Sequence, residues 1–192
     1  MVSAQRAFSS RQPAFATIPS AAFGAALFPS LPEDEFDRQP LKTTSLVLVA
    51  DIRVDNRQEL ISSLRLDGPS TRTLADSDLL LVAWQRWGPL CIKRIVGDYA
   101  IAVYDETTKQ LTLARSITGQ RPLFYRRAGH RIAFASMPSG LLASPGSSRE
   151  FDRNSLVRAV LDLPYRPGAT VFSNVHRVPP GRCIGLSRDG HR

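Results

Sequence analysis

The stretch Val96–Ala143, VGDYAIAVYDETTKQLTLARSITGQRPLFYRRAGHRIAFASMPSGLLA, decides the fold. Apolar residues alternate along DYAIAVYD and again along LTLA, and short polar turns separate these runs, as in antiparallel hairpins. Both faces of DYAIAVYD carry apolar or small residues, so we expect this strand to be covered on both sides. The stretch therefore predicts four antiparallel strands in two hairpins, over residues 98–105, 111–114, 122–127 and 131–136, followed by a short helix.

The segments on the N-terminal side add a strand and two helices. The run LVLVADIRV at 46–54 predicts a strand, and Asn56 is placed to cap a short helix, with Glu59 three residues later as in a capping box. A second helix is expected over SDLLLVAWQRWG, with Asp76 or Ser77 as its cap.

The segments on the C-terminal side predict a further helix and two further strands. We expect a helix at NSLVRAVLDL, capped by Asp152 or Asn154, a strand starting at Thr170 and a last strand over RCIGLSR. Antiparallel strands with segregated helices predict an α+β domain. The length of 192 residues suits one domain, in which residues 1–31 form a poorly patterned N-terminal arm or first strand and residues 32–192 form the folded unit.

Composition narrows the class of protein. The net charge of +8 comes mostly from arginines scattered along the chain, whereas a nucleic-acid surface would gather them on one face, so we expect no nucleic-acid partner. The chain has neither an apolar run long enough for a membrane helix nor a secretory signal, which predicts a cytoplasmic protein without a membrane partner. Cys91 and Cys183 form neither a disulfide framework nor a metal pattern, and we interpret both as packed core thiols.

The order GDYAIAVYD, LARSITGQRPLFY, IAFASMPSGLLA and a late Pro179-Pro180-Gly181 resembles the glutaminase-type N-terminal domain of asparagine synthetases. The resemblance runs from about Pro32 to the end of the chain. It implies a four-layer αββα sandwich of two antiparallel sheets, as in N-terminal nucleophile hydrolases. It also implies that a C-terminal synthetase domain is missing, because no SGGxDS-type pyrophosphate loop is present. ATP and Mg²⁺ are expected only in that domain, so no cofactor and no metal is expected in this chain.

The residues that carry chemistry in the family are altered here. The family strand Asn-Gly-Glu-Ile-Tyr-Asn corresponds to DIRVDN at 51–56, and the family holds the oxyanion with the Asn side chain and the next backbone N–H. Asp51 replaces that Asn, and an ionised carboxylate repels an oxyanion and donates no hydrogen bond. Ile52 replaces the Gly, which restricts the approach of a ligand to the backbone.

One charged residue of the family pattern is retained. Asp78 matches the family aspartate that holds the amino group of glutamine, and it either keeps that role or caps its helix. Asp51 and Asp78 are therefore the candidate substrate-binding residues, as altered equivalents of the glutamine pocket.

The family nucleophile is absent from the start of this sequence. A glutaminase of this class attacks with a cysteine at residue 1, and its own α-amine serves as the base, whereas this chain begins Met1-Val2. We therefore assign no catalytic residue. β-Lactam synthetase and the lasso-peptide macrolactam synthetases keep the fold without that cysteine, because the amine that closes the ring is already in the substrate. The runs PEDEFDRQPL and ADIRVDNRQEL look closest to the lasso-peptide branch.

Three hypotheses remain open. The leading one is a degenerate glutaminase-like domain, a pseudo-glutaminase, that scaffolds an ATP-dependent amide-forming domain of the same protein; a precursor peptide and a second copy in a homodimer are further candidate partners. The second is an active, glutamine-hydrolysing amidotransferase whose start has been misassigned. The third is a free-standing peptide-binding module.

Overall fold

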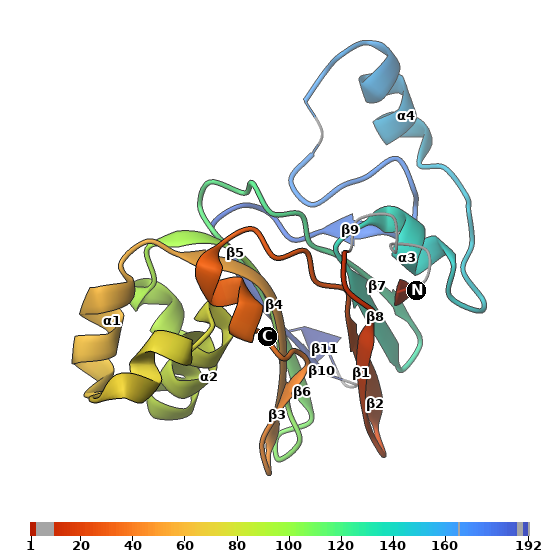
Figure 1. The fold of residues 1–192 in the computed structure, drawn as a ribbon. Helices are drawn as coiled ribbons and strands as arrows, with labels where there is room; N and C mark the ends of the chain where they lie inside the picture. The colour runs from red at the N-terminus through yellow and green to blue at the C-terminus, as the bar shows by residue number, and fades with distance from the viewer. Residues whose placement is uncertain (3–9, 165, 188–189, 192) are drawn as a thin grey trace.

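The predicted strand Leu46–Val54 is β4, the second strand from one edge of the larger sheet in the computed structural model, which describes residues 1–2, 10–164, 166–187 and 190–191. It pairs antiparallel with β5, from Leu46 opposite Asp105 to Val54 opposite Gly97. The six-stranded sheet consists, in spatial order, of β11 (Gly190–His191), β10 (Cys183–Ser187), β6 (Gln110–Arg115), β5 (Gly97–Asp105), β4 and β3 (Leu41–Lys42) (Figure 1).

Two smaller antiparallel sheets cover one face of the six-stranded sheet. The three-stranded sheet has the order β8 (Arg131–Ala135), β7 (Phe124–Ala128) and β9 (His176–Arg177), and a two-stranded hairpin joins β1 (Ala14–Ile18) to β2 (Ala21–Ala25). Ile18 and Phe23 of the hairpin share one core with Val47 and Val49 of β4 and with Leu123. The first 31 residues therefore contain a hairpin that packs against the larger sheet.

Helices cover the opposite face of the six-stranded sheet. α1 (Arg57–Leu64), α2 (Asp76–Trp87) and the 3₁₀ helix η4 (Gly88–Arg94) enclose a second core with β4 and β5. α3 (Pro138–Leu142) packs on the outer side of the three-stranded sheet through Leu141. The layers are thus helix, sheet, sheet and helix. The remaining helices are η2 (Pro32–Phe36), η3 (Pro69–Thr73) and α4 (Arg153–Val160).

The alternation along β5 explains how one strand serves two cores. Tyr99, Ile101 and Val103 face the helices, whereas Ala100 and Ala102 face the second sheet layer. All of them are buried, which confirms the prediction that this strand is covered on both sides. The sheet-facing positions hold only alanine in the middle of the strand, so the space between the layers is not filled from this side.

The two predicted hairpins are present, but they lie in different sheets. β5 and β6 belong to the six-stranded sheet, whereas β7 and β8 pair with each other and with β9. The loop from Ser116 to Leu123 crosses between the layers. Alternation predicts which side chains share a face of a strand, and it carries no information about which sheet the strand joins.

The predicted caps are partly wrong. The N-cap of α2 is Ala75, whose N–H donates to the Asp78 carboxylate at 2.8 Å, so neither Asp76 nor Ser77 caps this helix. Asn56 precedes α1 as predicted, and its amide donates to the Glu59 carboxylate at 3.2 Å. Its side-chain oxygen, however, accepts from the Val96 N–H just ahead of β5 and not from a backbone N–H of the first turn. Asp152 does cap α4, since its carboxylate accepts from the backbone N–H of the third residue after it, at 2.7 Å.

The strand predicted from Thr170 is also wrong. The Thr170 hydroxyl donates to the carbonyl of Val175 at 2.7 Å and accepts from the N–H of Phe172 at 3.1 Å, which holds this segment as a turn. Phe172 pairs with Phe151 through an isolated antiparallel β-bridge. Within the described ranges, no helix combines the length and the apolar character needed to cross a bilayer.

A buried ion pair ties the helical layer to β4. Asp76 is 2% exposed, accepts from the Val54 N–H at 2.7 Å and is paired with Arg57, which also donates to the carbonyl of Leu74. Burial raises the pKa of Asp76, while the contacts with Val54 and Arg57 act in the opposite direction. Loss of one partner from such a group leaves an uncompensated buried charge.

We therefore predict that Asp76→Ala lowers the free energy of unfolding by about 3–5 kcal/mol, because Arg57 and the Val54 N–H would stay buried without their acceptor. Urea unfolding followed by circular dichroism measures this change. Asp67→Ala removes a carboxylate from an exposed loop and serves as the control, with an expected change below about 0.5 kcal/mol. Equal, small changes in the two variants would contradict the prediction.

Candidate functional site

A cavity of about 800 Å³ lies between the two sheet layers. Its walls come from β4 and β5, from β8, from β2 with the segment that follows it, and from the loop ahead of β7. Ala100 and Ala102 of β5 belong to the wall, and their small side chains leave the space open. Met1 and Val2 also line the cavity, and neither side chain is a nucleophile.

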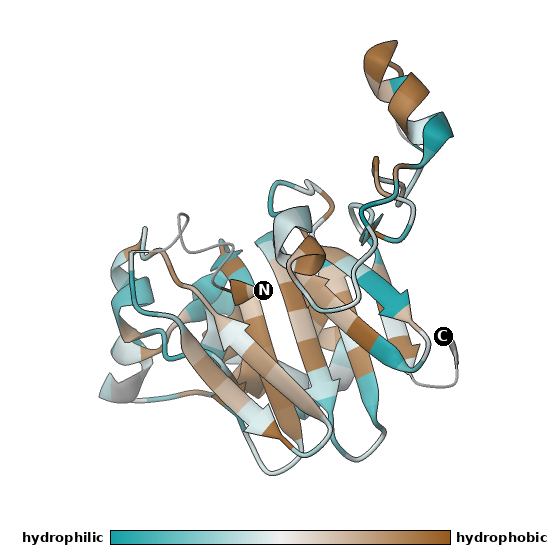
Figure 2. Ribbon diagram, turned by 90° about the vertical axis from the view of Figure 1, so that its right-hand side faces the viewer, coloured by the Kyte–Doolittle hydropathy of each residue, from teal (hydrophilic) through white to brown (hydrophobic). Residues whose placement is uncertain are grey.

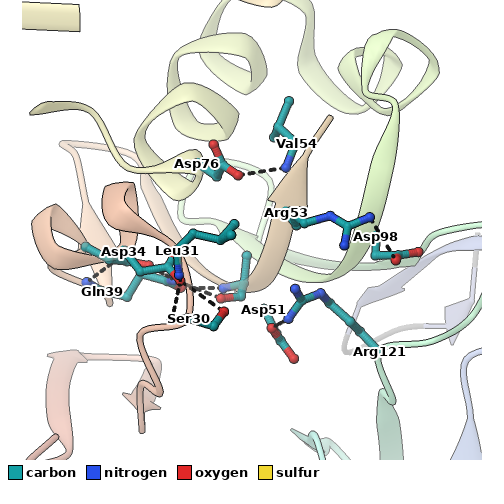
Figure 3. Close-up of polar contacts among 12 residues, drawn as sticks. Ser30, Leu31, Asp34, Gln39, Asp51, Arg53, Val54, Asp76, Asp98 and Arg121 are labelled. Atoms are coloured by element: carbon teal, nitrogen blue, oxygen red, sulfur yellow. Dashed lines mark hydrogen bonds and ion pairs between the residues drawn. The ribbon is translucent and has the colours of Figure 1, made fainter. Parts of the chain in front are cut away.

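Asp51 lies at the charged end of this cavity. It is on the sheet-facing side of β4, two residues beyond Val49 and directly opposite Ala100. Its carboxylate is 49% exposed and forms an ion pair with Arg121, which is 26% exposed (Figure 3). The structure thus places the predicted residue Asp51 at the cavity, where the Arg121 guanidinium pairs with its carboxylate.

Arg115 holds the loop that carries Arg121. The buried Arg115 guanidinium donates from Nε to the carbonyl of Arg121 at 2.7 Å, from Nη1 to that of Val178 at 2.8 Å, and from Nη2 to that of Gly119. Burial lowers the pKa of Arg115, and Arg177 lowers it further. Three backbone carbonyls from two segments are therefore fixed by one side chain at the end of β6.

Gly119 lets the same loop turn closely past its neighbour. Its φ is +61°, in the left-handed region, and a Cβ there would lie 2.7 Å from Pro180 Cγ. Only glycine fits both conditions without strain. The Gly and Pro residues of the GQRP and PPG motifs therefore pack against each other and shape the approach to Arg121.

The Arg121 guanidinium has hydrogen-bonding capacity left over. Nη1 pairs with Asp51, and the buried Nε has no hydrogen-bond partner within the described part of the chain. Burial lowers the pKa of Arg121, while the Asp34 carboxylate acts to raise it. A buried donor without an acceptor costs about 1–3 kcal/mol, so an additional acceptor at this guanidinium would be favourable.

Gln39 fixes the backbone next to Asp51. The Gln39 side chain is 2% exposed, donates to the carbonyl of Ala50 at 2.7 Å and accepts from the Ala50 N–H, so it takes the place of a strand partner at the edge of β4. Its amide also donates to Asp37 at 2.8 Å, and Asp37 accepts from the Ser77 hydroxyl at 2.9 Å. These hydrogen bonds fix the backbone of Ala50, and they therefore fix the position from which the neighbouring Asp51 side chain reaches the cavity.

Asp78, the second predicted residue, lies at the start of α2. Its carboxylate accepts from the N–H of Ala75, the N-cap residue of α2, so Asp78 closes the start of this helix, in line with the capping role given above as the alternative. Burial raises the pKa of Asp78, and the Ala75 hydrogen bond opposes this. Asp78 is not one of the residues that line the cavity, so the structure does not bring it together with Asp51. Its role in holding a ligand stays a prediction.

Ile52 lies next to Asp51 on β4. Its side chain is 8% exposed and belongs to the core under the helices, on the far side of β4 from Asp51. The residue is nevertheless one of those that line the cavity. Its effect on the approach of a ligand to the backbone stays a prediction.

Sequence reasoning missed Arg121 and Gln39. Arg121 lies within the run LARSITGQRPLFY and Gln39 within PEDEFDRQPL, and neither run marks these residues as part of a site. Both act through contacts with β4 that the pattern of the chain does not reveal. The sequence signal for Arg121 is a charged residue directly before Pro122, where the chain leaves a loop and enters a buried strand.

Neither cysteine lines the cavity. Cys91 is fully buried among the helices, and burial raises the pKa of its thiol to about 12. Cys183 is exposed at the first residue of β10, which corrects the prediction of a packed thiol, although partial burial also raises the pKa of this thiol. Among the residues that the structure describes, no group of three or more His, Cys, Asp or Glu side chains is arranged to hold a metal ion.

Comparison with known proteins places this geometry in context. Residues 31–192 match a family model described as a glutamine amidotransferase domain. The chain is 29% identical over 161 residues to asparagine synthetase (glutamine-hydrolyzing) 3 of Bacillus subtilis (strain 168), covering 81% of this chain and 26% of that protein. It is 28% identical over 108 residues to asparagine synthetase (glutamine-hydrolyzing) 2 of the same strain, covering 56% of this chain and 14% of that protein. The chain thus spans about a quarter or less of the length of these relatives.

A solved structure supports the fold. The glutamine phosphoribosylpyrophosphate amidotransferase from Bacillus subtilis, complexed with ADP and GMP, matches with a TM-score of 0.56 and 20% identity, over 89% of this chain and 34% of that one. At this identity the likeness concerns the fold alone. It confirms the predicted α+β sandwich of antiparallel sheets of the N-terminal nucleophile hydrolase type.

The two thiols are expected to differ in reactivity with a thiol reagent at pH 8. Cys183 should react in the native protein because it is exposed, whereas Cys91 should react only after unfolding because it is buried and its pKa lies near 12. Counting modified thiols by intact mass measures this, and Cys183→Ala is the control that should abolish native labelling. Fast labelling of Cys91 in the native chain would contradict the structure.

Proposed function

Since the chain belongs to the family of glutamine amidotransferase domains and is related to asparagine synthetases, we propose that it has lost glutamine hydrolysis and scaffolds an ATP-using, amide-forming domain of the same protein. The ATP and Mg²⁺ would bind in that second domain. Within the family we propose the branch without an N-terminal cysteine, in which the amine is already part of the substrate and ammonia is not needed. A precursor peptide that is closed into a ring would be such a substrate.

The observation that carries the loss of hydrolysis is the Asp51–Arg121 ion pair. Hydrolysis of an amide builds negative charge on the carbonyl oxygen, which glutaminases stabilise with hydrogen-bond donors. Asp51 presents an acceptor with a negative charge at that point, and it also neutralises Arg121, the nearest cation. Loss of one oxyanion donor typically costs about 2.7–4 kcal/mol of transition-state stabilisation.

The absence of a cysteine from the described cavity wall supports the same conclusion. Among the described residues that line the cavity, Ser30 and Ser136 carry hydroxyl groups, and none is a histidine that could act as a base. The Ser30 hydroxyl donates to Asp34 at 3.3 Å, and the same carboxylate accepts the N–H groups of Ser30 and Leu31, each at 2.8 Å. Asp34 therefore serves as a local cap and is not free to activate a nucleophile.

A scaffold needs a surface for its partner, and α4 offers one. α4 projects from the rest of the chain, and Figure 2 shows hydrophobic residues along it. The apolar side chains exposed on this segment are Phe151, Leu156, Val157, Val160, Leu161 and Leu163. Exposed apolar patches of this kind mark interaction sites in proteins. The relatives extend well beyond the region that this chain matches, so a further domain is the partner that we propose for this surface.

We predict that the purified protein releases no glutamate or ammonia from glutamine above the buffer rate. Asp51→Asn restores the family's side chain, but it should not restore hydrolysis, because it supplies no nucleophile. A coupled glutamate dehydrogenase assay on both proteins measures this. Release by the unaltered protein at a rate clearly above buffer would overturn the proposal in favour of an active amidotransferase.

A second prediction tests the scaffold role. Leu156→Glu with Val160→Glu should weaken co-purification with the ATP-using domain at least ~10-fold, because charged side chains resist burial in an apolar interface. Val96→Glu is the matched control, since Val96 is an exposed valine (59%) away from α4. Circular dichroism checks that each variant is folded. Association that is equal in the double variant and the control would exclude this surface as the docking site.

A further inference from the structure

We propose that the cavity between the sheets binds an apolar ligand that ends in a carboxylate, such as a hydrophobic amino acid derivative or the C-terminal residue of a peptide, with the carboxylate on Arg121 and the apolar body against Phe23 and Phe134. This inference goes beyond the proposed scaffold role. It concerns the cavity for which we propose the loss of glutamine hydrolysis, and its test therefore measures ligand binding and not hydrolysis.

The inner part of the cavity suits an apolar body. Phe23 of β2 lies with its ring centroid 6.0 Å from that of Phe134 of β8, and both residues line the space together with Val49, Ala102 and Leu123. A volume of about 800 Å³ is within the range of small-molecule pockets in proteins, which is about 300–1,000 Å³. Glutamine would leave its side-chain amide in this apolar part without partners, and such burial is unfavourable.

The outer end suits a carboxylate. Arg121 has a buried Nε without an acceptor and is paired through Nη1 alone with Asp51, so a carboxylate at the free edge of the guanidinium would add the charge-assisted bonds that Arg prefers. Nε is covered in this structure, so a ligand carboxylate reaches this edge only when the Arg121 side chain moves on binding. The side chain is 26% exposed, which leaves part of it accessible from the cavity.

One continuous space joins the charged end of the cavity to its apolar end. Asp51 and Val49 lie two residues apart on the sheet-facing side of β4, and both line the cavity. Ala100 and Ala102 of the neighbouring strand carry small side chains and line the same space. The cavity that Arg121 lines is therefore the one that Phe23 and Phe134 also line.

Isothermal titration calorimetry with defined probes tests this inference. The probes are N-acetyl-phenylalanine, its amide, and a tetrapeptide ending in phenylalanine with a free or an amidated C-terminus. We expect saturable binding of the free acids and at least ~10-fold weaker binding of the amides. Arg121→Met should weaken binding of the acids at least ~10-fold, whereas Arg72→Met, which removes an exposed arginine elsewhere, should leave it unchanged. Ala102→Leu should reduce binding by filling the cavity.

Each outcome decides the inference. Binding of the acetylated amino acid assigns the site to small molecules, and binding of the tetrapeptide alone assigns it to a peptide terminus; both support a carboxylate site. No binding of any probe, equal binding of acids and amides, or full binding by a folded Arg121→Met would overturn it. The glutamate-release assay responds to hydrolysis and not to these probes, so failure of this inference and failure of the proposed loss of hydrolysis are distinguishable.

Discussion

The Arg115 guanidinium is the interaction on which the site depends. It donates to three backbone carbonyls, at Gly119, Arg121 and Val178, and so fixes the segment that passes from the six-stranded sheet to the three-stranded sheet. A buried arginine without a carboxylate partner is stable only when carbonyl oxygens satisfy it. Because the loop cannot shift without breaking these bonds, Arg121 is held where its side chain meets Asp51.

The electrostatics at the cavity follow from this constraint. Asp51 lies within β4 next to Ala50, whose backbone is held by the Gln39 side chain, and Arg121 lies on a loop held by Arg115. The two side chains form an ion pair at the cavity, and the loss of hydrolysis that we propose rests on this pairing, because an oxyanion needs hydrogen-bond donors there. The backbone on each side of the pair is held by side-chain hydrogen bonds.

Much of the fold could be predicted from alternation in the sequence. β4, β5 and β6 occur where apolar residues alternate, and the burial of both faces of β5 is confirmed by Ile101 on one side and Ala102 on the other. The distribution of strands between two sheets could not be predicted, because it depends on the crossing loop that Arg115 holds. For the same reason Asp51 was found from the sequence and its partner Arg121 was not, since their pairing is a tertiary contact between β4 and that loop.

The proposed loss of hydrolysis requires that no residue at the cavity acts as a nucleophile toward a bound amide. Its most direct test is intact mass spectrometry after incubation with a diazoketone analogue of glutamine, which alkylates the nucleophile of a glutamine-hydrolysing site. The account predicts an unchanged mass under native conditions. A gain of one adduct, mapped by peptide sequencing to a residue that lines the cavity, would contradict it and identify a working nucleophile beside Asp51.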